Sequence, residues 1–336
     1  MYEVIATAVK RTGGTGRILI AGAGALGSAY GGLLAAAGCD VTLLARGAHA
    51  EALRRNGLLL LLPEGARRIE VTVVDEDEPD VVLLTSKAFD TPAVLERVHG
   101  APRLAVSFQN GPGKNEPLER RFGAAATAGA ASTLPAELVE PGVVRAAGLG
   151  ATYLAARTPA QAEAVDELAA ALRGAGLTVH STDDADAMEW SKLAQVAATM
   201  GVQAVSRAYL HEVFGSPDGA VLVRRIVADV GALARAGGSD LVDLPGTLPA
   251  RTLADGSDEE AVALLAERGR QLEKAGAVRS RTSLLQSIEA GRRTELEEIH
   301  GELVRRAAQV GVAVPTLEAT YRLARLGAER EAPPGA

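Results

Sequence analysis

The chain has 336 residues, of which 47% are hydrophobic, and its 35 basic and 42 acidic residues give a formal net charge of −7. This composition is typical of a globular protein and the length indicates two domains, so intrinsic disorder and a fibrous repeat are disfavoured. The negative charge repels phosphate and the aromatic content is only 3%, which disfavours nucleic acid and anionic membrane surfaces as partners. No run of about 18 apolar residues exists that could span a bilayer. The single cysteine, Cys39, excludes an internal disulfide and a multi-cysteine metal site, as we expect of a cytoplasmic protein.

The first predicted strand, Arg17–Ala21, opens into the run Gly22-Ala-Gly24-Ala25-Leu26-Gly27, after which Ser28–Ala37 is rich in small residues and predicts a helix. In a strand, glycine turn and helix of this kind, the three glycines permit a tight turn, close approach of the backbone to a pyrophosphate, and close packing of helix on strand. The amides at the start of the helix then face the phosphates. Glycine turns also occur where nothing binds, so this pattern gains its weight from its setting.

Arg46 directly follows the second predicted strand, Val41–Ala45, and lies 24 residues after Gly22. At this strand end, dinucleotide-binding folds place an acidic residue against the ribose 2′-hydroxyl of NAD or an arginine against the 2′-phosphate of NADP. Asp40 lies at the wrong end of the strand to reach the ribose, so Arg46 predicts NADPH. The alternative is that Arg46 is an ordinary solvent-exposed loop arginine.

Polar residues follow two further predicted strands of the first half. Strands are predicted at Ile69–Val74, Val81–Thr85 and Leu104–Phe108, with a helix at Thr91–Val98. Alternating strands and helices favour a doubly wound sheet, in which ligands bind at the carboxyl ends of the strands. Two such ends carry the candidate site loops Ser86-Lys87 and Gln109-Asn110-Gly111. The alternative is ordinary turn chemistry, because Asn-Gly is a common turn dipeptide.

The pattern changes near Ser181–Asp184. Before this point, residues 125–155 are extended and glycine-punctuated, followed by a predicted helix at Thr158–Gly174 and a strand at Leu177–His180. After it, helices are predicted at residues 185–207, 217–236, 259–275, 294–311 and 316–326. We therefore expect a loosely held N-terminal extension (1–16), an α/β domain (17–183), an all-helical domain (184–328) and a tail (329–336). The helical domain offers a homodimer interface, but no heptad pattern requires one.

Lysine is rare in this chain, with five lysines against thirty arginines, so each lysine stands out. Lys192 follows Trp190 near the start of the first long helix of the second domain, where it can project toward the nucleotide domain. Partial removal of its ammonium from water lowers its pKa toward the range of a useful proton donor for carbonyl reduction. The alternative is an exposed surface lysine, the commonest environment of this residue.

Glu297 and His300 have the E-x-x-H spacing that supplies metal ligands in di-iron helix bundles. Such a site needs two of these pairs and two further glutamates, and the chain has only one pair, so no metal is expected. Glu297 also stands three residues after Thr294, a spacing that predicts a helix-capping box. The chain contains no G-x-S-x-G motif, which leaves nucleophilic hydrolysis without support.

Seven short motifs in the right order resemble the ketopantoate reductase family across residues 17–326. They are Gly22-Ala-Gly-Ala-Leu-Gly27, the VTLLAR-G-x-H run through Arg46 and His49, Ser86-Lys87-Ala88, Gln109-Asn110-Gly111, Pro141-Gly142-Val-Val, Trp190-Ser-Lys192-Leu193 and the SLLQSIEAGRRTELEEIHG block. The resemblance implies a Rossmann-type N-terminal domain and an all-α C-terminal domain like that of 6-phosphogluconate dehydrogenase. It also implies NADPH-dependent reduction of a 2-oxo acid to a 2-hydroxy acid, with 2-dehydropantoate reduced to pantoate as the usual reaction.

The resemblance also implies roles for individual residues. Lys192 would be the general acid, and Glu295 would organise the substrate and the lysine. Asn110 and Ser283 would hold the substrate, with the serine near its carboxylate. The cofactor would be bound by Gly22, Gly24, Ala25, Leu26, Gly27, Arg46, Lys87 and Asn110, with Lys87 beside its nicotinamide end. A cation that polarises the carbonyl and donates a proton stabilises the alkoxide charge that develops on hydride transfer.

The sequence departs from the family pattern at Val196 and Met200. The pattern W-x-K-L-x-x-N-x-x-x-N has asparagines there, which contact the hydroxyl-bearing tail of the substrate. An unpaired hydroxyl facing an apolar wall costs roughly 1 to 3 kcal/mol, so the first alternative is a relative that acts on a more apolar 2-oxo acid or ketone. The charged segment between Asp243 and Arg279, longer than usual, is expected to reshape the mouth of the cleft. The second alternative is a non-catalytic NADP-binding sensor, against which the retained Lys192 and Glu295 argue.

Overall fold

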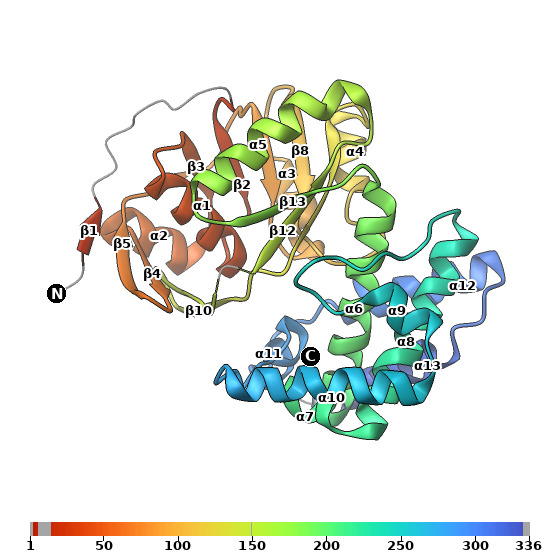
Figure 1. The fold of residues 1–336 in the computed structure, drawn as a ribbon. Helices are drawn as coiled ribbons and strands as arrows, with labels where there is room; N and C mark the ends of the chain where they lie inside the picture. The colour runs from red at the N-terminus through yellow and green to blue at the C-terminus, as the bar shows by residue number, and fades with distance from the viewer. Residues whose placement is uncertain (1–2, 6–14, 149, 332–336) are drawn as a thin grey trace. The chain divides into compact units, whose positions relative to one another are not determined.

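The computed structural model describes residues 3–5, 15–148 and 150–331. It divides into two compact units, Met1–Gln109 with Gly113–Ala185, and Asn110–Pro112 with Asp186–Ala336. The first unit contains strands and helices, and in the second the described elements are helices (Figure 1). The predicted fold class, an α/β domain of the Rossmann type followed by a helical domain, is confirmed.

The first unit is organised around an eight-stranded sheet with the order β13-β12-β9-β8-β7-β2-β3-β6. Its strands are β2 (Ile18–Ala21), β3 (Val41–Leu44), β6 (Thr72–Val74), β7 (Val81–Leu84), β8 (Leu104–Ser107), β9 (Thr127–Ser132), β12 (Ala151–Ala155) and β13 (Thr178–Ser181). From β6 to β9 the strands are parallel and follow the 3-2-1-4-5-6 order of dinucleotide-binding folds. The order reverses between β2 and β7, so the carboxyl ends of these two strands form the expected ligand-binding edge.

Helices cover both faces of this sheet. They are α1 (Ala25–Ala36), α2 (Gly47–Asn56), the 3₁₀ turn η1 (Ala88–Asp90), α3 (Thr91–Leu95), α4 (Glu116–Phe122), the 3₁₀ turn η2 (Pro159–Gln161) and α5 (Ala162–Gly174). Side chains alternate along β2: Ile18 and Ile20 pack in the cluster that includes α1 and α5, whereas Leu19 and Ala21 pack in the cluster that includes α3 and α4. All four residues are buried, as is typical of a strand covered on both sides.

Helix α1 is packed between this sheet and a second, five-stranded sheet with the order β1-β5-β4-β11-β10. The second sheet consists of β1 (Glu3–Ile5), β4 (Leu58–Leu62), β5 (Gly65–Ile69), β10 (Ala136–Glu140) and β11 (Val143–Ala146). A Cβ on Gly31 would lie 3.0 Å from Leu43 of the first sheet, and one on Gly32 would lie 2.5 Å from Leu58 of the second. The small residues of α1 therefore allow both sheets to approach the same helix.

The second sheet corrects one predicted element. The single strand predicted at Ile69–Val74 is wrong, because the chain leaves β5 at Ile69 and enters β6 of the other sheet at Thr72. Within the expected N-terminal extension, Glu3–Ile5 forms β1 and pairs in parallel with β5. Residues 1–2 and 6–14 of that extension lie outside the described part of the chain.

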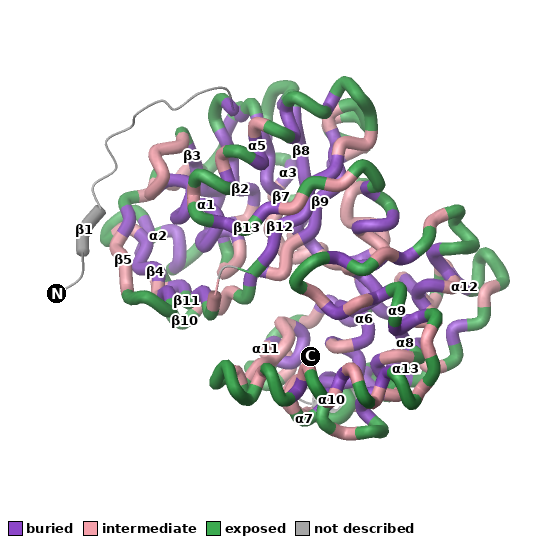
Figure 2. The backbone as a smooth tube through the Cα atoms, viewed as in Figure 1, coloured by how far each residue is buried: buried purple, intermediate pink, exposed green. Residues whose placement is uncertain are grey.

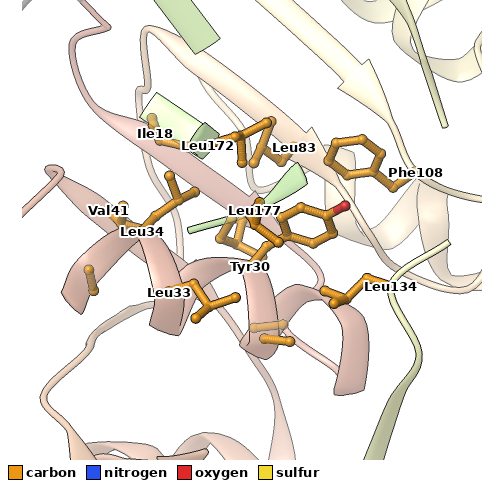
Figure 3. Packing of buried hydrophobic residues seen from close by; sticks show 14 of the residues in the cluster. Ile18, Tyr30, Leu33, Leu34, Val41, Leu83, Phe108, Leu134, Leu172 and Leu177 are labelled. Atoms are coloured by element: carbon orange, nitrogen blue, oxygen red, sulfur yellow. The ribbon is translucent and has the colours of Figure 1, made fainter. Parts of the chain in front are cut away.

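The core of the first unit includes Tyr30 of α1 and the apolar side chains that Figure 3 labels around it. Its ring stacks on Phe108, with ring centroids 4.7 Å apart. Its hydroxyl forms hydrogen bonds with Ser132 Oγ at 2.8 Å and Thr152 Oγ1 at 2.6 Å, so its polar atom is paired. Burial raises the pKa of the phenol to about 12. Tyr30 thus connects α1 to β9 and β12.

The second unit has one extended apolar core, and Figure 2 shows its buried residues. Its described helices are α6 (Ala185–Ser206), α7 (Leu210–Gly215), α8 (Pro217–Ala236), α9 (Ala250–Asp255), α10 (Asp258–Lys274), α11 (Ser283–Glu289), the π-helical turn η3 (Glu297–Gly301), α12 (Glu302–Val310) and α13 (Pro315–Glu331). The predicted bounds of α8 are confirmed, and its apolar period buries Val223, Val227 and Val230. Within the described ranges, no helix is long and apolar enough to cross a membrane.

The helix predicted at Thr294–Gly311 begins later than expected. Its first helical residue is Leu296, and its first turn is the π-helical η3. The predicted capping box is wrong, because Glu297 lies inside this turn and its carboxylate accepts a hydrogen bond from the Tyr321 hydroxyl at 2.8 Å. Gly311, with a φ of 69°, ends α12 in the left-handed conformation.

Candidate functional site

Each glycine of the turn after β2 has a different environment. Gly22 has a φ of +99°, and a Cβ there would lie 2.6 Å from the Cα atom of Ser86, so only glycine fits this tight turn. A Cβ on Gly27 would overlap the Oγ1 atom of Thr85, which reflects close packing of helix on strand. A Cβ on Gly24 would meet nothing within 4 Å. The open side of Gly24 leaves room for a ligand to approach the backbone.

The N-terminus of α1 provides backbone donors at this turn. The first hydrogen bond of the helix runs from Ser28 N to Gly24 O at 2.9 Å, so the amides of Ala25, Leu26 and Gly27 precede the helical ladder. The helix begins at Ala25 rather than at the predicted Ser28, which places these amides in its first turn. No acidic side chain occupies that turn. Amides at the positive end of the helix dipole, without a competing carboxylate, favour an anion such as a phosphate.

The loop after β7 lies against the glycine turn. The Oγ1 atom of Thr85 donates a hydrogen bond to Gly22 O at 2.9 Å. Ser86 follows directly, and its Cα atom would lie 2.6 Å from a Cβ on Gly22, so the structure brings Ser86 beside the turn; Lys87 is the next residue. Gln109, after β8, donates from its side-chain amide to Ser86 O at 2.7 Å, which ties the two predicted site loops together.

Arg46 is the N-cap residue of α2, directly after β3, and its side chain is 73% exposed. Its Nη2 atom donates to Asp90 Oδ2 at 2.6 Å. Asp90 is the last residue of η1, in the segment after β7. Because β3 and β7 flank β2, this ion pair joins loops from the two sides of the switch point. Arg46 is therefore solvent-exposed, as in the alternative interpretation, and it is also paired.

His49 connects two of the sequence motifs, although no role was predicted for it. Its Nδ1 atom accepts a hydrogen bond from Gly142 N at 2.9 Å, and its Nε2 atom lies 2.9 Å from Ser28 Oγ. An amide can only donate, so Nδ1 is unprotonated, Nε2 carries the proton, and the Ser28 hydroxyl accepts it. Ser28 in turn donates to Ala23 O at 3.3 Å, within the glycine turn. The residue types alone do not predict that His49 connects Gly142 to the glycine turn.

Lys192 lies on α6 of the second unit and is half-buried. Burial lowers the pKa of its ammonium to about 8, which confirms the predicted direction. Neighbouring side chains anchor the long segment after α8 to the same helix. Ser191 Oγ accepts a hydrogen bond from Val242 N at 2.7 Å, and Gln195 Oε1 accepts one from Leu248 N at 3.1 Å. Two neighbours of Lys192 on α6 are thus held by the segment between α8 and α9.

The remaining polar residues predicted for the substrate lie on separate segments of this unit. Glu295 is 6% exposed and comes just before η3. Asn110 is partly buried, and the adjacent Gly111 has a φ of +113°. A Cβ on Gly111 would lie 3.0 Å from Glu298 O, so the Asn110 segment packs beside the turn that follows Glu295. Ser283 is the first residue of α11 and is also partly buried.

Val196 and Met200, which stand where the family pattern has asparagines, are each 5% exposed and belong to the apolar core of the second unit. The spacing of Lys192, Val196 and Met200 places them on one side of α6. This side of the helix therefore has one ammonium followed by two apolar side chains.

The E-x-x-H pair has structural partners. His300 is fully buried and its Nε2 atom lies 2.8 Å from Ala197 O, whereas Glu297 is bonded to Tyr321. Burial lowers the pKa of His300 to about 4. Among the residues that the structure describes, no group of three or more histidine, cysteine, aspartate or glutamate residues could hold a metal ion.

Two family models match this chain. The model described as Ketopantoate reductase PanE/ApbA matches residues 18–159, and the model described as Ketopantoate reductase PanE/ApbA C terminal matches residues 184–328. The chain belongs to the ketopantoate reductase family. This membership confirms the resemblance carried by the seven motifs, and it makes the protein an oxidoreductase.

Several relatives of this ketopantoate reductase family member match it over nearly their whole length. The 2-dehydropantoate 2-reductase of Archaeoglobus fulgidus is 32% identical over 305 residues, which cover 88% of this chain and 92% of that protein. The crystal structure of a ketopantoate reductase from Ralstonia eutropha JMP134 has a TM-score of 0.75 at 26% identity, covering 94% of this chain and 99% of the other. A D-mandelate dehydrogenase with NADH and anilino(oxo)acetate has a TM-score of 0.81 at 21% identity, with coverage of 94% and 99%, and shows that the fold is shared.

Proposed function

We propose that this protein catalyses the NADPH-dependent reduction of a 2-oxo acid to a 2-hydroxy acid, with 2-dehydropantoate as the first candidate substrate. The observation that carries the proposal is Lys192, a half-buried residue whose ammonium has its pKa lowered by burial to about 8. A second support is the glycine turn with its open side at Gly24. The names of the curated relatives agree with this reaction.

The residues of the first unit fit a dinucleotide. Gly22, Gly24 and Gly27 would admit the pyrophosphate, and the amides of Ala25 and Leu26 would donate to it. Arg46 would bind the 2′-phosphate, and Lys87 would lie toward the nicotinamide end. When bound, NADPH would supply the hydride.

The ammonium of Lys192 would act as the general acid. A group with a pKa of about 8 is roughly nine-tenths protonated at pH 7, and it gives up its proton more readily than an ordinary lysine. Lys192 would polarise the substrate carbonyl and donate a proton from Nζ to the oxygen while the carbonyl carbon accepts the hydride. These events convert the oxo acid to the hydroxy acid, and the neutral Lys192 amine then regains a proton from water.

Three more side chains would orient the substrate. Glu295 would hold the ammonium of Lys192 and the substrate in position, and its burial suits an organising role. Asn110 would contact both cofactor and substrate, and its segment packs beside the turn after Glu295. Ser283, at the first position of α11, would lie near the substrate carboxylate.

A more apolar 2-oxo acid or ketone is the second candidate substrate, and the apolar side chains of Val196 and Met200 favour it. These residues offer no hydrogen bond to a hydroxylated tail. An apolar tail loses nothing against them, whereas a hydroxyl left unpaired is destabilised.

The proposal is tested by following NADPH oxidation with a panel of 2-oxo acids that includes 2-dehydropantoate and 2-oxoisovalerate, with product analysis by mass spectrometry. We expect oxidation that depends on the oxo acid and yields the 2-hydroxy acid. NADPH binding without turnover on any member of the panel would instead identify a non-catalytic NADP-binding sensor.

A further inference from the structure

In the proposed function Arg46 binds the 2′-phosphate, and in the structure the same guanidinium is paired with Asp90. The Arg46 side chain is 73% exposed, whereas that of Asp90 is 22% exposed. The Asp90 carboxylate accepts a hydrogen bond of 2.6 Å from the Arg46 guanidinium. A phosphate that approaches this guanidinium therefore meets a carboxylate that holds the same group.

The turn that carries Asp90 is held by several hydrogen bonds. Asp90 N donates to Lys87 O at 2.9 Å, which closes η1. The next residue, Thr91, donates from Oγ1 to Lys87 O at 3.3 Å and accepts from Gln109 Nε2 at 2.7 Å. The backbone that carries the carboxylate therefore belongs to a hydrogen-bonded turn that bridges the loops after β7 and β8.

We propose that Asp90 is a specificity-determining residue that competes with the 2′-phosphate for Arg46 and so limits the preference for NADPH over NADH. This inference rests on the proposed role of Arg46 toward NADPH. The carboxylate opposes binding of the phosphate in two ways: it occupies donors of the guanidinium, and its negative charge repels a group of like charge a few ångströms away. NADH has a hydroxyl at this position, so the charge of Asp90 affects the affinity for NADH much less than the affinity for NADPH.

Asp90→Asn keeps the size of the side chain and removes its charge. We expect it to lower the dissociation constant for NADPH about three- to tenfold, because it frees Arg46 from an exposed ion pair and removes one negative charge near the phosphate. The dissociation constant for NADH should change by less than about twofold, because the carboxylate has no charged counterpart there. Asp90→Ala should act in the same direction.

The measurement is isothermal titration calorimetry of the purified 336-residue chain with NADPH, NADH, 2′,5′-ADP and 5′-AMP at one fixed ionic strength. The last two compounds lack nicotinamide and differ only in the 2′-phosphate, so their comparison reports that group without catalysis. Glu137→Gln is the matched control, because Glu137 also pairs with an arginine, Arg145, at 2.8 Å, but on β10 and β11 of the second sheet. It removes the same charge and should leave all four constants unchanged.

Arg46→Ala separates failure of this inference from failure of the proposed cofactor. If Arg46→Ala weakens NADPH and 2′,5′-ADP selectively while Asp90→Asn leaves them unchanged, Asp90 does not compete and the inference is wrong. If Asp90→Asn weakens them, Asp90 positions Arg46 instead, and the inference is again wrong. If Arg46→Ala weakens NADPH and NADH equally, the role of Arg46 in the proposed function fails, and this inference fails with it.

Discussion

The backbone amide of Gly142 donates a hydrogen bond to Nδ1 of His49 at 2.9 Å, across 93 residues of sequence. The same ring bonds to Ser28, which bonds to Ala23 in the glycine turn. Gly142 O in turn accepts from Leu59 N, so the second sheet is connected to the turn through one imidazole. Burial lowers the pKa of this imidazole, which favours the neutral ring that the pairing requires.

We expect His49→Ala to lower the free energy of unfolding by about 2 kcal/mol, because it leaves the buried Gly142 amide and the Ser28 hydroxyl without this partner. Ser28→Ala, the milder control, removes only one end of the chain of bonds and should cost about half as much. Urea unfolding measures both values. An unchanged midpoint for His49→Ala would show that the ring does not hold the two sheets and the turn together.

Stability should fall on the acid side because of His300. Its pKa is about 4 in the folded chain against an ordinary value of 6.5, so between these pH values the unfolded chain binds a proton that the folded chain does not. The stabilisation is therefore complete above about pH 6.5 and is lost as the pH falls toward 4, by roughly 3 kcal/mol in total.

The variant His300→Gln, which has an amide donor for Ala197 O but no titrating ring, tests this pH dependence. We expect the difference in unfolding free energy between pH 7.5 and pH 5 to be roughly 2 kcal/mol smaller in His300→Gln than in the unmodified chain. The comparison uses the difference within each protein, so a general loss of stability does not affect it. An equal acid-side loss in both proteins would contradict the prediction.

Two glycines of the nucleotide turn should respond differently to alanine. Gly24→Ala places a methyl group in open space, so the fold should be retained while NADPH binding weakens at least tenfold through contact with the pyrophosphate. Gly27→Ala meets Thr85 and should lower the free energy of unfolding by about 1 to 3 kcal/mol. Thermal unfolding and NADPH titration of both variants measure this. Equal loss of stability in the two variants would refute the assignment of an open side to Gly24.

Substitutions on α6 test which substrate tail the protein prefers. If Val196 and Met200 face that tail, the chain should prefer 2-oxoisovalerate over hydroxylated 2-dehydropantoate, because one unpaired hydroxyl corresponds to about ten- to a hundredfold in kcat/KM. The double substitution Val196→Asn and Met200→Asn should move the ratio back toward 2-dehydropantoate. A tenfold preference of the unmodified protein for 2-dehydropantoate would show that another group pairs with the hydroxyl.

Features that depend on neighbours along the chain were predictable from sequence. The turn at Gly22, Gly24 and Gly27 follows from glycine spacing, and the long helix α8 follows from its apolar period. The short helices α7 and α9, with six residues each, were not predicted, because so few residues define no period. The two sheets around α1 were also not predicted, since the residues between β5 and β6 look continuous in sequence.

The site was predictable in its residue types but not in its pairings. The direction of the Lys192 pKa followed from partial burial, yet its value of about 8 depends on the packing of α6. The partner of Arg46 is 44 residues away, and the partner of His49 is 93 residues away. Such contacts are set by strand order and loop geometry, which no local pattern contains.

The role of Lys192 is tested most directly by the rate of NADPH oxidation with a 2-oxo acid substrate in Lys192→Ala. We expect kcat to fall by a factor of about 10² to 10⁴, the usual contribution of a positioned general acid, while the dissociation constant for NADPH stays within about twofold. Lys274→Ala, which removes an exposed lysine of α10, is the matched control and should retain full activity. Full turnover in Lys192→Ala would contradict the account and would make Lys192 an ordinary surface lysine.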